Sequence, residues 1–368
     1  MNSNNTIRGS GAALPCVPVL DVRNGGPVEH ARLRPAQAAA VRDHCLGWLP
    51  AGRALAWLGD PLVRGWLRRS GSTYVGDIGA IAGTVGGAGT WLLHGAYLFG
   101  CTALVDEGGD GPRLRRTLDW PFPGLGHLVE VAHQAGTAGD YLSVTWPGFA
   151  GVLTAVAPGR FAAAINQAPM RRITNAAWLR WIDYGLNAIR ALARSGGELP
   201  EHLLRRAFET CDSFEAAREL LRTAPVARPV LFTLTGTRAG EVAVIERTET
   251  AARVFDGAAT VANAWRQAMP GWEPRVCGVG TPVENNRRRR AALAPWTGRA
   301  GRCFGWAQAP VVNSFTRLTV EMEAACGALR VAGWEADGRG GAAPVTRNLS
   351  LTDRVATTCA DDAPEIAA

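Results

Sequence analysis

The sequence predicts an α+β fold in which helices are layered on mainly antiparallel sheets, and two observations lead to this prediction. From Pro35 through Ala96, Ala, Leu, Trp and Arg recur at helical spacing. From Cys101 onward, short strand-like pieces follow one another without helices between them, which implies antiparallel pairing. The later chain then alternates groups of helices and groups of strands. At 368 residues and 47% hydrophobic content, the chain is long enough for one large domain or two ordinary ones.

These patterns divide the chain into three regions. We expect a helical N-terminal segment over residues 1–100, a main body over 101–335 and a loosely ordered, Gly/Ala/Asp/Thr-rich tail over 336–368. The expected strands cover residues 101–105, 127–132, 141–146, 151–156, 160–165, 229–235, 241–246, 252–255 and 260–262, with a late hairpin over 314–332. The expected helices of the body cover residues 175–194, 200–210, 213–222 and 283–294.

The basic residues exclude several kinds of chemistry, because all 39 of them are arginine. Without lysine there is no P-loop, no Schiff base to pyridoxal phosphate and no kinase strand lysine. There is also no H-E-x-x-H, no G-x-S-x-G, and no pair of histidines at metal-ligand spacing, so we expect neither a cofactor nor a metal. Against 32 acidic residues the net charge is +7, but the arginines are spread along the whole chain. We therefore expect no nucleic-acid partner.

The sequence also carries hints about location and redox state. The longest apolar stretches, such as Trp91 to Ala103, are too short or too interrupted to span a bilayer, and residues 1–11 do not form a secretory leader. The expectation is a cytoplasmic protein. Eight cysteines are scattered without C-x-x-C spacing, so we expect them to be reduced.

The segment around Cys101 is the most informative part of the chain. Cys101 begins a predicted strand, and Arg116 and Asp119 follow 15 and 18 residues later, on the next strand after a glycine-rich turn. In an antiparallel hairpin, this spacing returns both residues to the beginning of the first strand, beside Cys101. The residues alone leave an ordinary interpretation open, in which Cys101 is a small buried apolar residue and the other two form an ion pair.

The same arrangement resembles the N-terminal-nucleophile (Ntn) hydrolases of the acid ceramidase and N-acylethanolamine acid amidase family. Penicillin V acylase, bile-salt hydrolase and the penicillin acyltransferases are related to that family. Cys101-Thr102 matches its Cys-Thr start, and residues 116–119 match its Arg-Asn-x-Asp motif with Thr in place of Asn. Further similar segments are residues 146–154, 158–161, 166–167, 225–246, 260–265, 285–288, 310–313 and 318–320. The resemblance runs from about Pro18 to Trp334. It implies an αββα sandwich with a helical pro-segment that remains attached as a small subunit after cleavage.

The resemblance also implies roles for the matched residues. Cleavage between Gly100 and Cys101 would make the Cys101 sulfur the nucleophile and its new α-amino group the base. An α-amine titrates near 7.7–8.0, where a base is useful at neutral pH. Asp119 would hold this amine, Arg116 would favour the thiolate, and Asn263 would stabilise the oxyanion. An ordinary turn asparagine remains the alternative for Asn263.

Other positions are matched less tightly. Arg287 matches the second arginine of the family, although the adjacent Arg288 leaves the register open and a solvated helix face is the ordinary interpretation for this arginine run. Gln167 stands where the amidases carry an acidic residue. The expected substrate-binding residues are Trp146, Asn166, Gln167 and Trp181.

These observations favour hydrolysis of a linear N-acyl amide, with an apolar or fatty acyl portion, through a thioester on Cys101. An N-acyltransferase is an alternative, because the Gly100-Cys101 bond and the Asp119-Trp120 pair also resemble the fungal penicillin acyltransferases. A non-catalytic lipid-binding relative is another. Tryptophans interleaved with arginines in the N-terminal segment suggest either core packing, an apolar slot or a peripheral contact with an anionic membrane. The expected partners are thus a small-molecule or lipid amide and the two subunits of one precursor.

Overall fold

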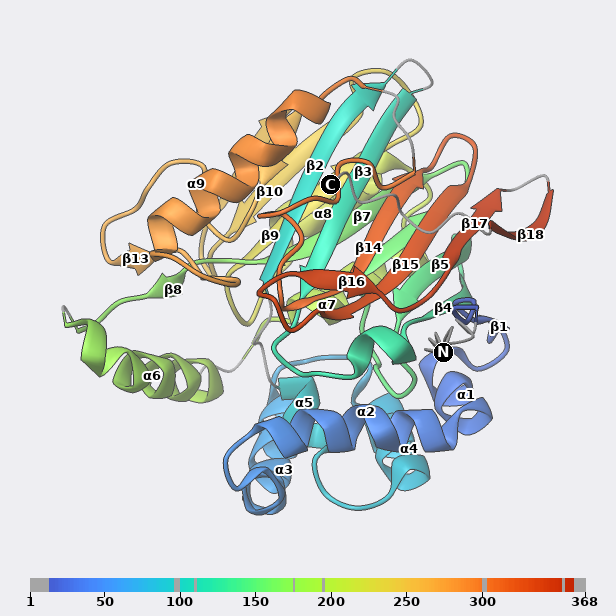
Figure 1. The fold of residues 1–368 in the computed structure, drawn as a ribbon. Helices are drawn as coiled ribbons and strands as arrows, with labels where there is room; N and C mark the ends of the chain where they lie inside the picture. The colour runs from blue at the N-terminus through green and yellow to red at the C-terminus, as the bar shows by residue number, and fades with distance from the viewer. Residues whose placement is uncertain are drawn as a thin grey trace, which may run out of the picture.

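Two eight-stranded sheets lie face to face at the centre of the computed structural model (Figure 1). It describes residues 13–95, 100–108, 111–174, 176–193, 196–299, 303–352 and 355–360, without the side chains of residues 177, 181 and 355–360. The first sheet, sheet I, contains in spatial order β1 (Val19–Asp21), β4 (Glu130–Gly136), β5 (Gly139–Thr145), β6 (Thr154–Ala157), β7 (Phe161–Gln167), β9 (Val230–Thr235), β10 (Val242–Arg247) and β11 (Ala252–Asp256). The second, sheet II, contains β12 (Ala259–Val261), β2 (Gly100–Gly108), β3 (Gly111–Asp119), β14 (Thr316–Glu323), β15 (Ala328–Ala336), β17 (Asn348–Thr352) and β18 (Val355–Ala360), with β16 (Ala342–Pro344) paired to β15.

Helices cover the outer faces of both sheets. Helices α7 (Pro200–Thr210) and α8 (Phe214–Thr223) pack on sheet I, and α9 (Pro282–Leu293) packs on β2 and β12 of sheet II. Every strand pair in the two sheets is antiparallel except β1 with β4. The predicted αββα sandwich with mainly antiparallel sheets is therefore confirmed.

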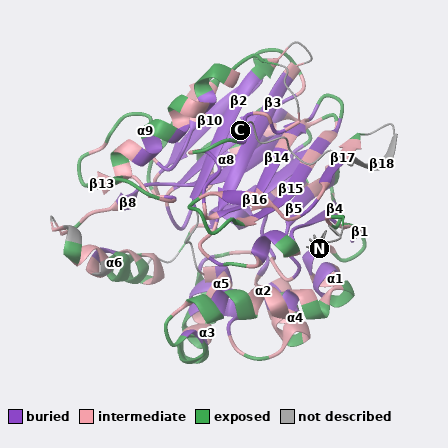
Figure 2. Cartoon of the chain, viewed as in Figure 1, coloured by how far each residue is buried: buried purple, intermediate pink, exposed green. Residues whose placement is uncertain are grey.

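Strand alternation decides which side chains of the central hairpin face the other sheet. In β2, Cys101, Ala103 and Val105 belong to the core between the sheets, whereas Leu104 packs outward against Leu293 of α9 and its neighbours. Figure 2 shows that the strands are mostly buried, while exposed residues gather on helices and loops. Functional side chains can thus approach Cys101 from either face of the hairpin.

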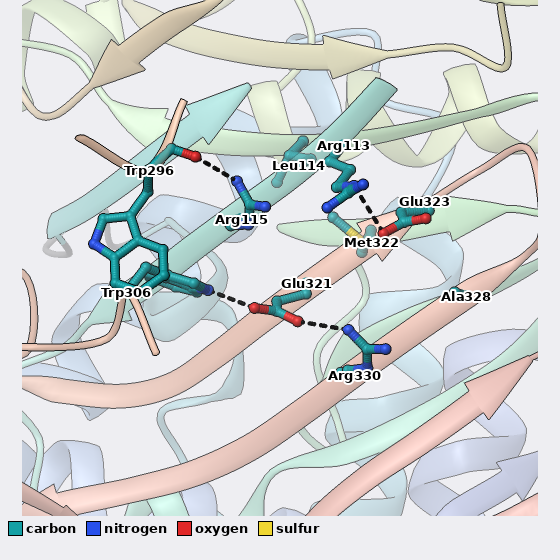
Figure 3. Close-up of a pocket in the computed structure, with 10 residues that line it drawn as sticks. All are labelled: Arg113, Leu114, Arg115, Trp296, Trp306, Glu321, Met322, Glu323, Ala328 and Arg330. Atoms are coloured by element: carbon teal, nitrogen blue, oxygen red, sulfur yellow. Dashed lines mark hydrogen bonds and ion pairs between the residues drawn. The ribbon is translucent and has the colours of Figure 1, made fainter. Parts of the chain in front are cut away.

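The outer face of β3, β14 and β15 carries a network of paired charges (Figure 3). Arg113 and Arg115 point to this face, and Glu321 accepts a hydrogen bond from Trp306 Nε1 at 2.6 Å and pairs with Arg330 at 3.0 Å. The cavity among them measures only about 20 Å³, which is room for one water molecule. We therefore interpret this face as a structural layer.

The N-terminal segment forms a helical unit at one end of the sandwich (Figure 1). It consists of α1 (Gly26–Leu33), α2 (Pro35–Trp48), α3 (Gly52–Arg69), α4 (Val75–Val85) and α5 (Thr90–Gly95). Trp66, Leu67, Ile78 and Ile81 form a small core together with Ala150, Leu199 and Ala227 of the main body. A further helix, α6 (Arg180–Ala193), follows the two-stranded pairing of β8 (Met170–Arg171) with β13 (Trp272–Glu273).

Some expectations from the sequence were wrong. The tail is not loose up to residue 360, because β16, β17 and β18 extend sheet II from β15. Leu349 packs into the main core, and the added strands satisfy the backbone groups of an edge that would otherwise be open. Cys16 is disulfide-bonded rather than reduced. Helix α1 was not expected. Among the described residues, none of the helices has the length and apolar character needed to cross a membrane.

Two buried histidines lie where the N-terminal segment meets the body. His94 Nδ1 lies 2.7 Å from Thr90 O, and its Nε2 accepts the Ala150 N–H at 3.0 Å, so the ring is held in its neutral form. His202 Nδ1 lies 2.7 Å from Ser72 Oγ. Burial lowers the pKa of His94, and it lowers the pKa of His202 well below its usual value.

We predict that these histidines destabilise the fold in acid. The unfolded chain takes up protons near pH 6.5 and the folded chain does not, so stability is lost as the pH falls below that value, by about 1.4 kcal/mol per pH unit for each ring that stays neutral. In His202→Asn, whose amide oxygen replaces Nδ1, the loss between pH 7 and 5 should shrink by about 2 kcal/mol. Urea unfolding at both pH values measures it, with the half-exposed His133→Asn as control; equal losses in wild type and His202→Asn would refute the prediction.

Candidate active site

Cys101 lies at the start of β2, buried between the two sheets. The β2–β3 register pairs Gly100 with Asp119 and Ala103 with Arg116, so the hairpin returns both polar residues to the cysteine as the spacing predicts. The Cys101 thiol is fully buried and is 3.5 Å from Ile165 O of β7. Burial raises the pKa of this thiol to about 11, against the opposing effect of Arg116. In the intact chain the sulfur therefore carries its proton.

Arg116 approaches Cys101 from the space between the sheets. Its Nη2 donates to Cys101 Sγ at 2.7 Å, and its Nη1 donates to Leu153 O at 2.6 Å and to Thr154 Oγ1. The guanidinium is fully buried and forms no ion pair with a carboxylate among the residues described. A buried cation without an anionic partner favours ionisation of the neighbouring thiol.

Arg289, not Arg287, is the second arginine at this site. From α9 its Nη1 donates to Cys101 O at 2.8 Å and to Thr102 Oγ1 at 2.9 Å. Arg287 lies on the opposite side of the helix, where it is exposed and pairs with Glu284 at 2.6 Å. Each residue turns an α-helix by 100°, so a shift of two positions moves the side chain from the buried face to solvent. The arginine that contacts Cys101 is thus two positions after the one that the sequence comparison matched.

Asp119 lies on the outer face of the hairpin, with Arg289. Its Oδ1 accepts a hydrogen bond from Thr316 Oγ1 at 2.8 Å, and its Oδ2 is 3.9 Å from Arg289 Nη1. Oδ2 is buried and has no hydrogen-bond partner among the residues that the structure describes. Burial raises the pKa of this carboxyl, and Arg289 and Thr316 oppose the increase. Asp119 Oδ2 can therefore accept a hydrogen bond from a donor placed beside it.

Asn263 connects Cys101 to both sheets. Its Oδ1 accepts the Cys101 backbone N–H at 3.0 Å and Arg289 Nη2 at 3.1 Å, and its Nδ2 donates to Gln167 O at 2.8 Å. A side-chain amide has two N–H donors, so one is left for a further oxygen. Asn166 Nδ2 donates to Ala262 O at 3.2 Å, which holds the loop before Asn263 against β7.

Gly100 and Cys277 are packed directly against each other. A Cβ at Gly100 would lie 1.6 Å from Cys277 Sγ, so only glycine fits before Cys101. Cys277 Sγ is 3.7 Å from Asn263 Oδ1. Burial raises the pKa of the Cys277 thiol above its usual range, so it too is protonated. The sequence marked Gly100, but nothing in it indicated Cys277.

Two adjoining cavities open at this site. The junction cavity, of about 260 Å³, is lined by Gly100, Asp119, Gln167, Cys277 and ten further residues around them. The apolar cavity, of about 630 Å³, lies between the N-terminal segment and α6 and is lined by residues such as Val63, Trp66, Leu92, Ala191, Leu192 and Trp272. Trp48, Met170, Tyr184 and Arg275 line both. A large apolar space thus adjoins the residues around Cys101.

The structure does not bring every expected substrate-binding residue to these cavities. Gln167 lines the junction cavity, but Asn166 does not line either cavity. Trp146 is buried away from both, where its Nε1 donates to Leu125 O at 2.8 Å and its ring packs on Trp120. Trp181 lies in α6, and its side chain is outside the described part of the chain.

The arrangement provides a thiol, a cation on either side of it, a free carboxylate oxygen and a free amide N–H. Sequence reasoning missed Arg289, and it also missed Asn285 and Asn286, which hold Arg289 Nε at 3.0 Å and Nη2 at 3.2 Å. The three residues share one face of α9, so their spacing could have indicated the correct arginine. Within the described ranges, no group of three or more His, Cys, Asp or Glu side chains could hold a metal ion.

The fold and the site together define a class: a four-layer αββα protein with a buried cysteine at the start of a central strand. No protein-family model matches the sequence, and a search of curated proteins also gives no match. Among solved structures, the chain is similar to a Caenorhabditis elegans N-acylethanolamine-hydrolyzing acid amidase ortholog, with 17% identity, a TM-score of 0.45, and coverage of 61% of this chain and 93% of that one.

Two further similar structures carry other names. One is the conjugated bile acid hydrolase of Clostridium perfringens, with 12% identity, a TM-score of 0.38, and coverage of 70% of this chain and 97% of that one. The other is the penicillin V acylase of Agrobacterium tumefaciens, with 10% identity, a TM-score of 0.38, and coverage of 68% and 90%. The three names are those of the groups that the sequence motifs resemble.

The contact between Gly100 and Cys277 gives a testable prediction. In a Cys101→Ala background, Gly100→Ala should lower the free energy of unfolding by about 1–3 kcal/mol, because the new methyl group overlaps the sulfur. Adding Cys277→Ala should recover most of this loss. Gly47→Ala is the control, since a Cβ there meets nothing within 4 Å. Denaturant unfolding of the set measures the coupling, and additive effects of the two substitutions would contradict the predicted contact.

Proposed function

We propose that this chain is a self-processing cysteine amidase that cleaves its own Gly100–Cys101 bond and then hydrolyses a linear N-acyl amide with an apolar acyl portion. The observation that carries this proposal is the contact of the Cys101 thiol with Arg116, at 2.7 Å, because this buried guanidinium forms no ion pair with a carboxylate among the described residues. A thiolate at Cys101 would supply the missing anion.

Self-cleavage would begin with attack of Cys101 Sγ on the Gly100 carbonyl carbon. The C–N bond breaks, the nitrogen keeps the proton that the thiol gives up, and a thioester joins Gly100 to the sulfur. Water then hydrolyses this thioester and leaves a Gly100 carboxylate, a Cys101 thiol and a free α-amino group. The absence of a side chain at Gly100 supports this step, since no Cβ obstructs the carbonyl.

In the processed enzyme, the α-amine of Cys101 would act as the base. It takes the thiol proton, the sulfur attacks the substrate carbonyl, and the amine returns the proton to the leaving nitrogen; water then hydrolyses the acyl-enzyme. The unpartnered Asp119 Oδ2 supports a role in holding the new ammonium group, and the second N–H of Asn263 supports a role at the oxyanion. Arg289, which donates to Cys101 O and to Asn263 Oδ1, would hold Cys101 and Asn263 in position relative to each other.

The first test of this proposal is the state of the chain. Wild type should yield fragments of about 10.6 and 28.4 kDa, by proportion of residues before and after the cut. Cys101→Ala should stay intact and inactive, because no sulfur is left to attack. Arg289→Gln should lower cleavage and kcat by about 10²-fold or more, whereas Arg287→Gln, a matched loss of charge on the exposed side of α9, should cleave normally.

Denaturing gels and mass spectrometry follow this cleavage. An active enzyme that shows only the intact chain would sink the self-processing mechanism. Equal effects of the two arginine substitutions would remove Arg289 from the proposed site.

The apolar cavity leads us to expect a long acyl chain. Each buried methylene contributes about 0.8 kcal/mol, so two more carbons should raise kcat/KM about tenfold until the cavity is full. Acetyl, hexanoyl, lauroyl and palmitoyl amides of one amine would measure this. Ala191→Phe, which fills the cavity from α6, should suppress the long substrates only, and Ala193→Phe, beyond the cavity on the same helix, should not. A wild-type preference for acetyl would rule out a fatty acyl substrate.

A peripheral membrane contact would suit such substrates. Trp57, Leu58 and Leu62 of α3 are 73%, 59% and 64% exposed, and arginines lie on the same helix. Trp57→Ser should reduce co-flotation with anionic vesicles at least severalfold, while Val283→Ser, an exposed apolar residue on α9, should not. If both variants floated with the vesicles to the same extent, the membrane contact would not lie at Trp57 of α3.

A further inference from the structure

A third cavity, separate from the two at Cys101, lies where β10, β12, the loop after Asn263 and α9 meet. We call it the Glu246 pocket; its volume is about 260 Å³, and it is lined by Glu246, Thr260, Arg266, Arg290 and small apolar residues. None of its lining residues lines the junction cavity or the apolar cavity. The proposed amidase mechanism leaves this pocket without a role.

Glu246 is an unusual group to find in such a pocket. The residue is only 4% exposed, and its Oε1 accepts the backbone N–H of Arg266 at 2.5 Å. Its Oε2 is buried and has no hydrogen-bond partner among the described residues. A buried carboxylate oxygen that lacks a donor is destabilising, so a ligand with an N–H or O–H would find a ready acceptor here.

Two arginines supply the opposite charge. Arg290 of α9 and Arg266 both line the pocket, and Arg266 is held with its guanidinium 4.9 Å from the centre of the Phe255 ring. In the described part of the chain, neither guanidinium has an ion-pair or hydrogen-bond partner. The ligand therefore has to offer anionic oxygens to two cations and, next to them, one hydrogen-bond donor.

We propose that the Glu246 pocket binds a protonated phosphate group, with Arg266 and Arg290 donating to its oxygens and Glu246 Oε2 accepting from its P–OH. Two guanidinium groups and one carboxylate leave one net positive charge for a dianion. Sulfate has the same shape, but it has no proton at neutral pH and would place an oxygen against the carboxylate. A simple ammonium ion would instead be repelled by the two arginines. Thr260 offers a further hydroxyl on the wall of the pocket.

The proposed ligand is free hydrogen phosphate rather than a phosphate monoester, because the two differ in their protons. At pH 8, inorganic hydrogen phosphate keeps one O–H, whereas a monoester, whose second pKa is about 6, has lost it. Burial raises the pKa of Glu246, and the Arg266 N–H and nearby arginines oppose the increase. We therefore choose pH 8, which is far above the ordinary pKa of a glutamate.

The experiment is isothermal titration of the full-length protein at pH 8 and constant ionic strength with sodium phosphate, sodium sulfate, glycerol phosphate and glycine. We expect phosphate to bind at least tenfold more tightly than the other three. Arg290→Gln and Arg266→Gln should each weaken phosphate binding about tenfold. Arg288→Gln, an equal loss of charge on the exposed part of α9 outside the pocket, should change it less than twofold.

Glu246→Gln tests the hydrogen bond to the ligand. Glutamine keeps the acceptor for Arg266 N–H but can present its amide N–H to the ligand, so sulfate should then bind as tightly as phosphate. Unchanged thermal unfolding of this variant would show that the effect is not loss of fold, and the two arginine variants test the site independently of it. The proposal would be overturned if wild type bound sulfate or glycerol phosphate as tightly as phosphate at pH 8, or bound glycine more tightly than phosphate. Full phosphate affinity in both arginine variants would also overturn it.

Discussion

A buried guanidinium that forms no ion pair within the described part of the chain is the constraint on which the rest of this site depends. Arg116 is fully buried between the two sheets, and its Nη2 donates to Cys101 Sγ at 2.7 Å. Placing a cation there is unfavourable unless an anion can form beside it. In the intact chain burial still dominates and raises the pKa of the thiol to about 11. Because the site is buried, an added positive charge at the Cys101 nitrogen would strongly lower the pKa of this thiol.

The stacked sheets explain how such a site can be built. Because side chains alternate along β3, Arg116 reaches Cys101 from the space between the sheets, while Asp119 lies on the outer face with Arg289. Asn263, from the loop after β12, bonds to the Cys101 nitrogen and to Gln167 at the end of β7. Four elements therefore converge on one peptide bond, and the core around them holds them rigid. The N-terminal helices complete the site from one end by closing the apolar cavity.

Local patterns predicted the body of the fold well. Helices α7, α8 and α9 and strands β9 to β12 lie within one or two residues of the expected ranges, because turn residues and hydrophobic periodicity act over a few neighbours. The prediction of a loosely ordered tail was wrong for the opposite reason. Strand β17 forms because β15, which lies at a distance in the sequence, offers it an open edge. The sequence pointed to Arg287 rather than Arg289 because a run of four arginines has no periodicity of its own. Only the packing of α9 on sheet II shows that Arg289 is the buried one.

The sequence by itself determined the hairpin of Cys101, Arg116 and Asp119, since strand geometry makes residues 15 and 18 positions later return to its start. It also determined the need for glycine at position 100 as a residue type, although not its cause. Only the tertiary structure decided which arginine contacts Cys101, that Cys277 packs on Gly100, and that Glu246 is buried in a pocket that Arg266 and Arg290 also line. The contacts of Cys101 with Arg289 and of Gly100 with Cys277 join segments more than a hundred residues apart, and Glu246 shares its pocket with residues from β12, α9 and the loop between them. Their geometry is set by how sheets and helices pack, and no short-range pattern encodes it.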